Sequence, residues 1–232
     1  MERIGFALIH GAGMGSWLWK EVVPELKAPT FAVDFPLRGN DSKEFGHVTL
    51  EEYVQEVSDQ LASFDVEKII LVGHSIGGEI ALRIATLQPE WVAGIAFVSA
   101  VVPASGSSMV LIDPRLEPLA MRIAQGAGPV RPPNRVIEKA VCNDLGEKAK
   151  ALVLEKYTYE SLHLFVDPVE WTVPTSVSKL YVRTTKDTSL LPTFQDKMIA
   201  NAQPIRVVEM ETGHLPMLSK PKELAEHLNG LL

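Results

Sequence analysis

Cysteine, clustered positive charge and long hydrophobic runs are all scarce in this 232-residue chain. The single cysteine, Cys142, excludes an intrachain disulfide and favours a reducing compartment; without a CxxC context we expect it to be a packing residue. The formal net charge is -7 and no Lys/Arg cluster is present, which argues against binding to nucleic acid or to an anionic membrane surface. The longest apolar run, residues 92–105, is shorter than the roughly 18 to 20 residues that a membrane span needs.

The start of the chain also lacks a visible targeting signal. The letters MERI lead directly into a strand-like segment, without the basic region and cleavable apolar stretch of a signal peptide. With the single cysteine, this predicts a cytoplasmic protein. No group of His, Asp and Cys residues has the spacing of metal ligands, so we expect neither a metal nor a cofactor.

What is present fits a globular protein with an α/β fold. Hydrophobic residues make up 46% of the chain and charged residues 22%, and the length suits one domain. Apolar runs without polar alternation, which are typical of parallel strands buried on both faces, alternate with helical patterns. We predict a mainly parallel sheet of about six strands flanked by helices. The predicted strands are Ile4–His10, Phe31–Phe35, Ile69–Gly73, Val92–Ser99, Leu180–Thr184 and Arg206–Met210, and the predicted helices are Ser16–Leu26, Leu50–Phe64, Ile76–Gln88, Leu191–Ala202 and Lys220–Leu232.

One stretch interrupts this alternation. Residues 103–174 contain no convincing central strand and several prolines. Helical patterns return there at Leu116–Gln125, Asn134–Val141 and Glu147–Tyr159. Because a long structured insertion between two strands is usually functional, we predict a core of residues 1–102 and 175–232 and a helical cap of residues 103–174 over the carboxyl edge of the sheet.

The segment GHSIGG joins a predicted strand to a predicted helix, and it places Ser75 between Gly73 and Gly77. A Gly-x-Ser-x-Gly motif in this position is the nucleophile elbow, a turn sharp enough to strain the serine backbone. Its neighbours must be small because the strand and the helix pass close together. Ser75 is therefore the predicted nucleophile.

A serine nucleophile needs a base, and the base needs a carboxylate that orients it. His214 follows the last predicted strand and Asp187 follows the strand before it, so both are expected at the carboxyl edge of the sheet. An aspartate in such a turn is more often an ordinary turn or helix-capping residue. The order Ser75, Asp187, His214 at successive strand ends nevertheless favours a catalytic triad.

The oxyanion of the reaction needs two fixed backbone N–H donors. One is the amide of Ile76, which follows the nucleophile at the start of a helix. The other is expected in the glycine-rich loop HGAGMGSW after the first strand, where Ala12 is the predicted donor. The glycine spacing of this loop is not G-x-G-x-x-G, so it does not predict a dinucleotide site.

Four stretches of the chain resemble the α/β-hydrolase superfamily, and within it the plant methylesterase and hydroxynitrile lyase group with its bacterial esterase relatives. They are LIHGAGMGSWLWKEVVPEL, GHSIGGEIAL, YVRTTKDTSLLPTFQDKMIA and VVEMETGHLPMLSKPKELAEHL. The similarity covers residues 3–100 and 178–232. It implies the same triad and the same oxyanion amides as the residues themselves predict.

The chain departs from the lyase pattern at two positions. Lyases of this group carry a lysine directly after the catalytic histidine, where this chain has Leu215, and a threonine where it has Gly11. Both differences imply a more open and less cationic site, which suits an ester and water better than cyanide.

We therefore predict a serine hydrolase that cleaves small, partly apolar carboxylic esters through an acyl-enzyme on Ser75. Two alternatives stay open: a lyase or cofactor-free dioxygenase on the same fold, and a non-catalytic receptor for a small ligand. The sequence also leaves a homodimer open. The predicted pocket residues are Gly11, Trp17, Leu119, Phe165, Trp171 and Leu215.

Overall fold

A computed structural model describes residues 2–36, 47–124 and 128–232. Its six strands form one parallel sheet in the order β2-β1-β3-β4-β5-β6. The strands are β1 (Ile4–Ile9), β2 (Thr30–Ala32), β3 (Lys68–His74), β4 (Val92–Val98), β5 (Ser178–Thr184) and β6 (Arg206–Met210). The predicted fold class is confirmed.

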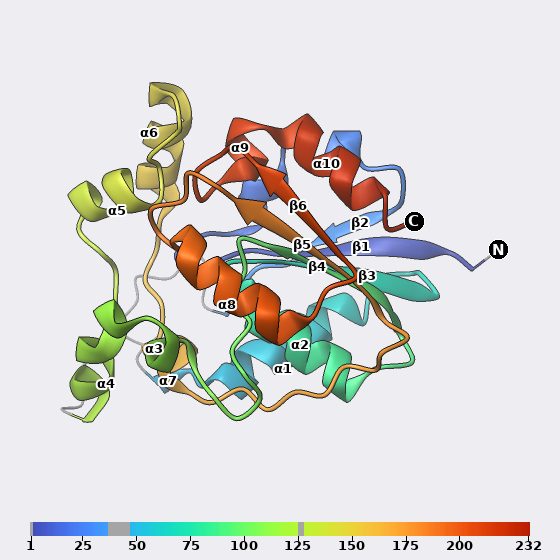
Figure 1. The fold of residues 1–232 in the computed structure, drawn as a ribbon, viewed down its shortest axis with the longest axis horizontal. Helices are drawn as coiled ribbons and strands as arrows, with labels where there is room; N and C mark the ends of the chain where they lie inside the picture. Colours follow the sequence, from blue (N-terminus) through green and yellow to red (C-terminus); the bar gives the residue numbers. More distant parts are fainter. Residues whose placement is uncertain (1, 37–46, 125–127) are drawn as a thin grey trace.

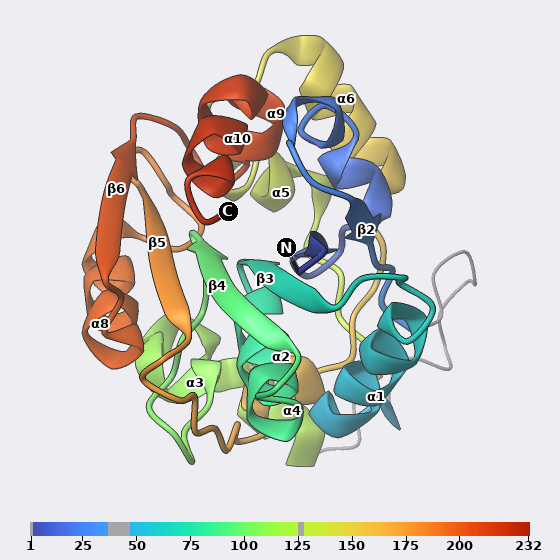
Figure 2. The ribbon, with the colours of Figure 1, turned by 90° about the vertical axis from the view of Figure 1, so that its right-hand side faces the viewer.

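Helices cover both faces of this sheet (Figures 1 and 2). One face carries α1 (Leu50–Leu61), α2 (Gly77–Leu87) and α8 (Pro192–Ala202). The other carries α9 (Pro216–Ser219), α10 (Pro221–Asn229) and two short 3₁₀ helices, η1 (Ser16–Trp19) and η2 (Val23–Glu25). A capping box begins α1, because the Thr49 hydroxyl and the Glu52 carboxylate each accept the other's backbone N–H.

The side chains of each strand divide between two cores. In β1, Ala7 and Ile9 lie in the cluster with α1, α2 and α8, whereas Phe6 and Leu8 lie in the cluster with α10. This follows from the two-residue period of a strand. Both sets are fully buried, which explains why the strands appear in the sequence as continuous apolar runs.

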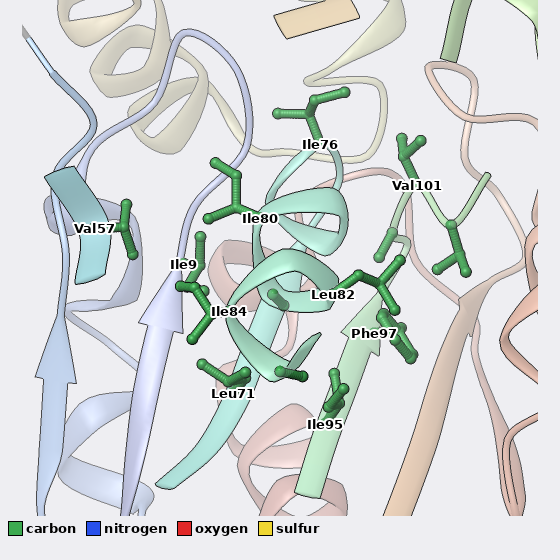
Figure 3. Packing of buried hydrophobic residues seen from close by; sticks show 14 of the residues in the cluster. Ile9, Val57, Leu71, Ile76, Ile80, Leu82, Ile84, Ile95, Phe97 and Val101 are labelled. Atoms are coloured by element: carbon green, nitrogen blue, oxygen red, sulfur yellow. The ribbon is translucent and has the colours of Figure 1, made fainter. Parts of the chain in front are cut away.

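Helix α2 is the element that seats the candidate nucleophile. Ile76, Ile80 and Ile84 recur every four residues and belong to one buried cluster (Figure 3). Each such side chain contributes about 1.5–3 kcal/mol when fully buried. The start of the helix is therefore fixed firmly over β1 and β3.

Two predicted elements differ from the structure by more than small shifts of their ends. Residues 16–26 form η1 and η2 instead of one helix, because Pro24 cannot donate the N–H that a continuous helix requires. Strand β2 ends at Ala32 instead of Phe35, and beyond it the N–H of Asp34 donates to the side chain of Gln60 on α1. The Gln60 side chain thus accepts the backbone hydrogen bond that a neighbouring strand would accept if β2 continued.

Between β4 and β5 the chain forms short helices beyond the carboxyl ends of the strands (Figure 1). We refer to residues 103–174 as the cap segment. Its helices are α3 (Met109–Ile112), η4 (Pro114–Leu116), α4 (Glu117–Ala124), α5 (Asn134–Ala140), α6 (Glu147–Lys156) and α7 (His163–Val166). Gln125, the predicted end of one helix, lies outside the described residues. Within the described ranges, no helix is long and apolar enough to cross a membrane.

Candidate active site

Ser75 lies in a sharp turn between β3 and α2. Its φ is +52°, in the left-handed region that strains a residue with a side chain. The turn is held on both sides: the N–H of Ser75 donates to the carbonyl of Val98 (3.2 Å), and its carbonyl accepts from the N–H of Val101 (2.8 Å). This is the backbone geometry that a nucleophile elbow requires.

The glycines around this turn are needed for close approach of the backbone. A Cβ on Gly73 would lie 2.7 Å from the carbonyl oxygen of Gly77, and a Cβ on Gly77 would lie 2.7 Å from that of His10. A Cβ on Gly11 would lie 2.9 Å from the Cβ of Ser75. Each distance is too short for a side chain, so strand, helix and first loop meet here only because these positions are glycine.

His214 and Asp187 are paired at the carboxyl edge of the sheet. His214 Nδ1 lies 2.8 Å from Asp187 Oδ2, and the two side chains are 6% and 0% exposed. Because a carboxylate oxygen only accepts, the proton belongs on Nδ1, which leaves Nε2 with a lone pair. His214 and Ser75 line the same cavity, so the structure brings the three predicted triad residues to one site.

Four further donors surround Asp187. Its Oδ1 accepts from the backbone N–H groups of Ser189 (2.8 Å) and Leu190 (2.9 Å), and its Oδ2 accepts from the hydroxyls of Thr184 (3.0 Å) and Ser99 (2.5 Å). Burial raises the pKa of this carboxyl, but the charge of His214 and these hydrogen bonds outweigh the burial, so the pKa lies below its ordinary value. Asp187 is therefore held as a carboxylate.

Ser99 is a site residue that the sequence analysis did not identify. It follows β4, is fully buried and has φ +43°. Its hydroxyl also lies 3.4 Å from His214 Nδ1. The signal was a hydroxyl at the end of a buried strand that lies between the strands of Ser75 and Asp187.

His74, next to the nucleophile, holds the base from the other side. Its Nε2 lies 2.9 Å from the carbonyl oxygen of His214, and the two rings are 4.8 Å apart. Burial, together with the charge of His214, lowers the pKa of His74 to about 3. The ring is thus neutral, and Nε2 donates to the carbonyl, which fixes the backbone of His214.

The two predicted oxyanion donors, Ala12 and Ile76, line the cavity together with Ser75. In the described part of the chain, neither backbone N–H donates to a protein acceptor. Most buried amides are hydrogen-bonded, so two unused N–H groups beside a candidate nucleophile are available to a ligand oxygen.

A cavity of about 330 Å³ lies beside these groups. Three predicted pocket residues, Gly11, Leu119 and Phe165, line it. Its further apolar lining from the cap segment comprises Met109, Leu116, Val130, Pro132, Val136, Ile137, Ala140, Val141 and Tyr157. A second hollow of about 450 Å³ lies between α1 and the end of α2 and contains no triad residue.

Three predicted pocket residues lie outside this cavity. Leu215 is fully buried in the core against α10. Trp171 turns away because its indole N–H donates to the carbonyl of Pro103 (2.9 Å), and the ring of Trp17 packs under the ammonium of Lys156. A large apolar side chain near a site is often part of the core, as Leu215 is, whereas Trp17 and Trp171 are partly buried and pack against the core.

Polar side chains also line the cavity. Arg115 of the cap segment forms an ion pair with the buried Asp113 (2.6 Å) and donates to the carbonyl of Ser189 (2.7 Å), two residues from Asp187. Glu160 accepts from the N–H of Gly13 (2.8 Å) and the hydroxyl of Tyr53 (2.7 Å). No group of three or more potential metal ligands occurs among the residues that the structure describes.

Residues 6–227 match the family described as the alpha/beta hydrolase family, and the chain belongs to this family. Methylesterase 8 of Arabidopsis thaliana is 27% identical over 98% of this chain and 89% of its own length. Norfluorocurarine synthase 1 of Strychnos nux-vomica is 26% identical over 96% and 93%. A chloroplastic Arabidopsis protein named as methylesterase 11 is 28% identical over 97% of this chain, which spans 63% of that relative.

Solved structures share the fold at lower identity. An extracellular α/β-hydrolase from a Paenibacillus species has a TM-score of 0.82 and 22% identity over 98% of both chains. Polyneuridine aldehyde esterase has a TM-score of 0.80 and 22% identity over 99% of both. A pyrethroid hydrolase from Sphingobium faniae has a TM-score of 0.77 and 23% identity over 98% of this chain and 96% of its own. At such identities the likeness shows the fold alone.

Proposed function

We propose that this protein is a serine hydrolase that cleaves small, partly apolar carboxylic esters. The observation that carries the proposal is the 2.8 Å pair of His214 and Asp187, with His214 and Ser75 lining one cavity. Ala12 and Ile76 line the same cavity, and their backbone N–H groups have no protein acceptor among the described residues. Relatives named as methylesterases and esterases support the same reaction type. They also make methyl esters the first substrates to test.

The mechanism follows from the protonation of His214. With its Nδ1 proton donated to Asp187, Nε2 accepts the proton of Ser75 while the serine oxygen attacks the ester carbonyl. The amides of Ala12 and Ile76 donate to the oxyanion. His214 then gives the proton to the leaving alcohol, and it later activates the water that releases the acid and restores Ser75.

The environment of Leu215 favours hydrolysis over cyanide chemistry. A lyase of this group needs a cation directly after the catalytic histidine, and here that position is an apolar side chain buried in the core. The cavity of about 330 Å³ with its apolar cap lining suits a small ligand of low polarity. A cytoplasmic location and a homodimer stay predictions from the sequence.

The test is formation of an acyl-enzyme on Ser75. With p-nitrophenyl acetate we expect a burst of one chromophore per protein, and with a fluorophosphonate we expect stoichiometric labelling. Ser75→Ala should abolish both and lower kcat by about 10⁴-fold or more, with an unchanged far-UV circular dichroism spectrum. Wild-type protein that binds small esters without a burst or labelling would instead be a receptor.

A further inference from the structure

The turn between α5 and α6 contacts the two loops that carry the acid and the base. The side-chain amide of Asn143 donates to the carbonyl of Lys186 (2.7 Å), the residue before Asp187. The carboxylate of Asp144 accepts from the N–H of Gly213 (2.6 Å), the residue before His214. Two adjacent side chains of the cap segment thus hold the positions directly before the acid and the base.

The contact with Gly213 is close. A Cβ at Gly213 would lie 2.5 Å from Asp144 Oδ1, so the loop before the base packs against this turn without space for a side chain. Asp144 Oδ1 is buried and has no partner in the described part of the chain. Among the described residues, the hydrogen bond from the N–H of Gly213 to Oδ2 is therefore the one that the Asp144 carboxylate accepts.

A third link lies on the other side of Asp187. The hydroxyl of Thr188 is 3.0 Å from the carbonyl oxygens of Lys139 and Ala140, which end α5. Ala140 itself lines the cavity beside the triad, as does Val141. The end of α5 therefore touches the space for the substrate and the loop that carries the acid.

The loop of Asp187 and the loop of His214 are also joined to each other, because the N–H of Lys186 donates to the carbonyl of Thr212 (2.9 Å). A shift of either loop would change the bond between Asp187 and His214. Misplacement of catalytic groups by about 1 Å can cost on the order of 10²-fold in rate. Contacts that hold both loops at once therefore bear directly on catalysis.

We propose that Asn143 and Asp144 are positioning residues that couple the cap segment to the triad: Asp144 aligns His214 through Gly213, and Asn143 aligns Asp187 through Lys186. This inference rests on the proposed function. It makes the cap segment a part of the catalytic apparatus as well as the wall of the pocket, since α5 contacts the substrate space and the following turn holds the acid and the base.

The test compares Asp144→Ala with Asp144→Asn, which keeps an oxygen that can accept from Gly213. On an aryl ester, the alanine variant should lose about 10- to 100-fold in kcat with less than a threefold change in KM, and the asparagine variant should stay within about threefold of wild type. Glu147→Ala is the matched control, because it removes an exposed ion pair with Lys150 in the same segment. Wild-type kcat in Asp144→Ala would overturn the proposal.

A second readout separates this inference from the proposed function. The low-field proton resonance of His214 Nδ1 reports the bond to Asp187 without any substrate. We expect it in wild type and Asp144→Asn, and we expect it weakened or lost in Asp144→Ala. If wild type cleaves no ester while the resonance responds in this way, the proposed function fails and the positioning role stands. A resonance unchanged in Asp144→Ala would overturn the positioning role, and if that variant does not fold, Asn143→Ala gives the same comparison.

Discussion

The sheet with its flanking helices and the cap segment are built differently. Helix α2 of the sheet layer buries eight of its eleven residues, whereas α6 of the cap segment buries one of ten and α5 one of seven. The sheet layer is held by a continuous apolar core. The cap segment is held by a thinner apolar face together with hydrogen bonds such as those of Asn143, Asp144 and Arg115.

The two regions contribute different parts of the proposed enzyme: the sheet carries the triad, and the cap segment supplies most of the cavity lining. Ser75, Asp187 and His214 follow strands β3, β5 and β6 of the rigid layer, as precise chemistry requires. Most of the apolar cavity lining comes from the cap segment, where side chains can change without disturbing the sheet. Substitutions of the residues at the strand ends should therefore break turnover, and substitutions in the cavity lining of the cap segment should alter substrate preference.

The largest expected effect in the sheet layer, after loss of the nucleophile, comes from Asp187→Asn. The amide keeps the shape of the side chain, but it can present an N–H to His214 and so favour the wrong imidazole tautomer. We expect a loss of about 10³- to 10⁴-fold in kcat. Steady-state kinetics on p-nitrophenyl acetate would measure it.

Two neighbouring carboxylates serve as matched controls. Asp196 pairs with Arg183 (2.8 Å) and Glu211 pairs with Lys186 (2.9 Å), both in partly exposed ion pairs. Exposed ion pairs contribute little, so Asp196→Asn and Glu211→Gln should each stay within about tenfold of wild type. A larger loss in either control than in Asp187→Asn would assign the acid to a different residue.

The next effect concerns Ser99 at the end of β4, and it tests whether the Ser99 hydroxyl belongs to the active site. Ser99→Ala removes a hydrogen bond to a charged group, worth about 1.5–3 kcal/mol, so kcat should fall by about 10- to 100-fold. With one donor fewer, the pKa of Asp187 should rise, and the acidic limb of the pH–rate profile should move to higher pH. Ser99→Gly suits the positive φ and also lacks the hydroxyl, so it should lose as much. Recovery in Ser99→Gly would mean that backbone strain, not the hydroxyl, caused the loss.

The same two regions explain how far the sequence predicted the structure. Local patterns fix the strands of the sheet, so their number and order along the chain were predicted, although most of the predicted ends moved by one to three residues. Asp187 and His214 were predicted from their positions after successive strands, because parallel strands bring those ends together. The cavity lining of the cap segment could not be predicted in this way. Only tertiary packing decides that Leu119 faces the cavity and Trp171 does not. Ser99 was missed because its only signal is a hydroxyl at a strand end, and that signal does not identify the carboxylate that the hydroxyl contacts.

A smaller effect is expected in the cap segment from Leu119→Ala. Leu119 lines the cavity from α4, so its truncation should weaken binding of longer acyl chains and raise their KM by about 3- to 10-fold, with kcat on acetate esters nearly unchanged. Leu111→Ala is the matched control, because Leu111 on α3 is 76% exposed and absent from the cavity lining. Equal effects from both variants would mean that α4 does not contact the acyl chain.

The last expected effect is on stability and not on activity, at the junction of the two regions. Glu79 on α2 is fully buried, and neither of its carboxyl oxygens has a partner among the described residues. Burial and the nearby charge of Asp167 raise its pKa well above the ordinary value. Asp167, at the end of α7, accepts from the N–H of Leu50 and from His163 Nδ1. A protonated Glu79 therefore lies where the cap segment meets helices α1 and α2.

The sign of the pH dependence follows from that shift. Above the ordinary carboxyl pKa the unfolded chain loses the proton of Glu79 while the folded chain keeps it, so the free energy of unfolding falls as pH rises toward the folded pKa. Each pH unit in this window costs up to about 1.4 kcal/mol, or a few degrees in Tm. Glu79→Gln cannot ionise, so its Tm relative to wild type should increase in differential scanning calorimetry as pH rises above the ordinary carboxyl pKa. Parallel curves for the two proteins would mean that Glu79 is already ionised in the fold, and the junction between the sheet layer and the cap segment would then have to hold two carboxylates at once.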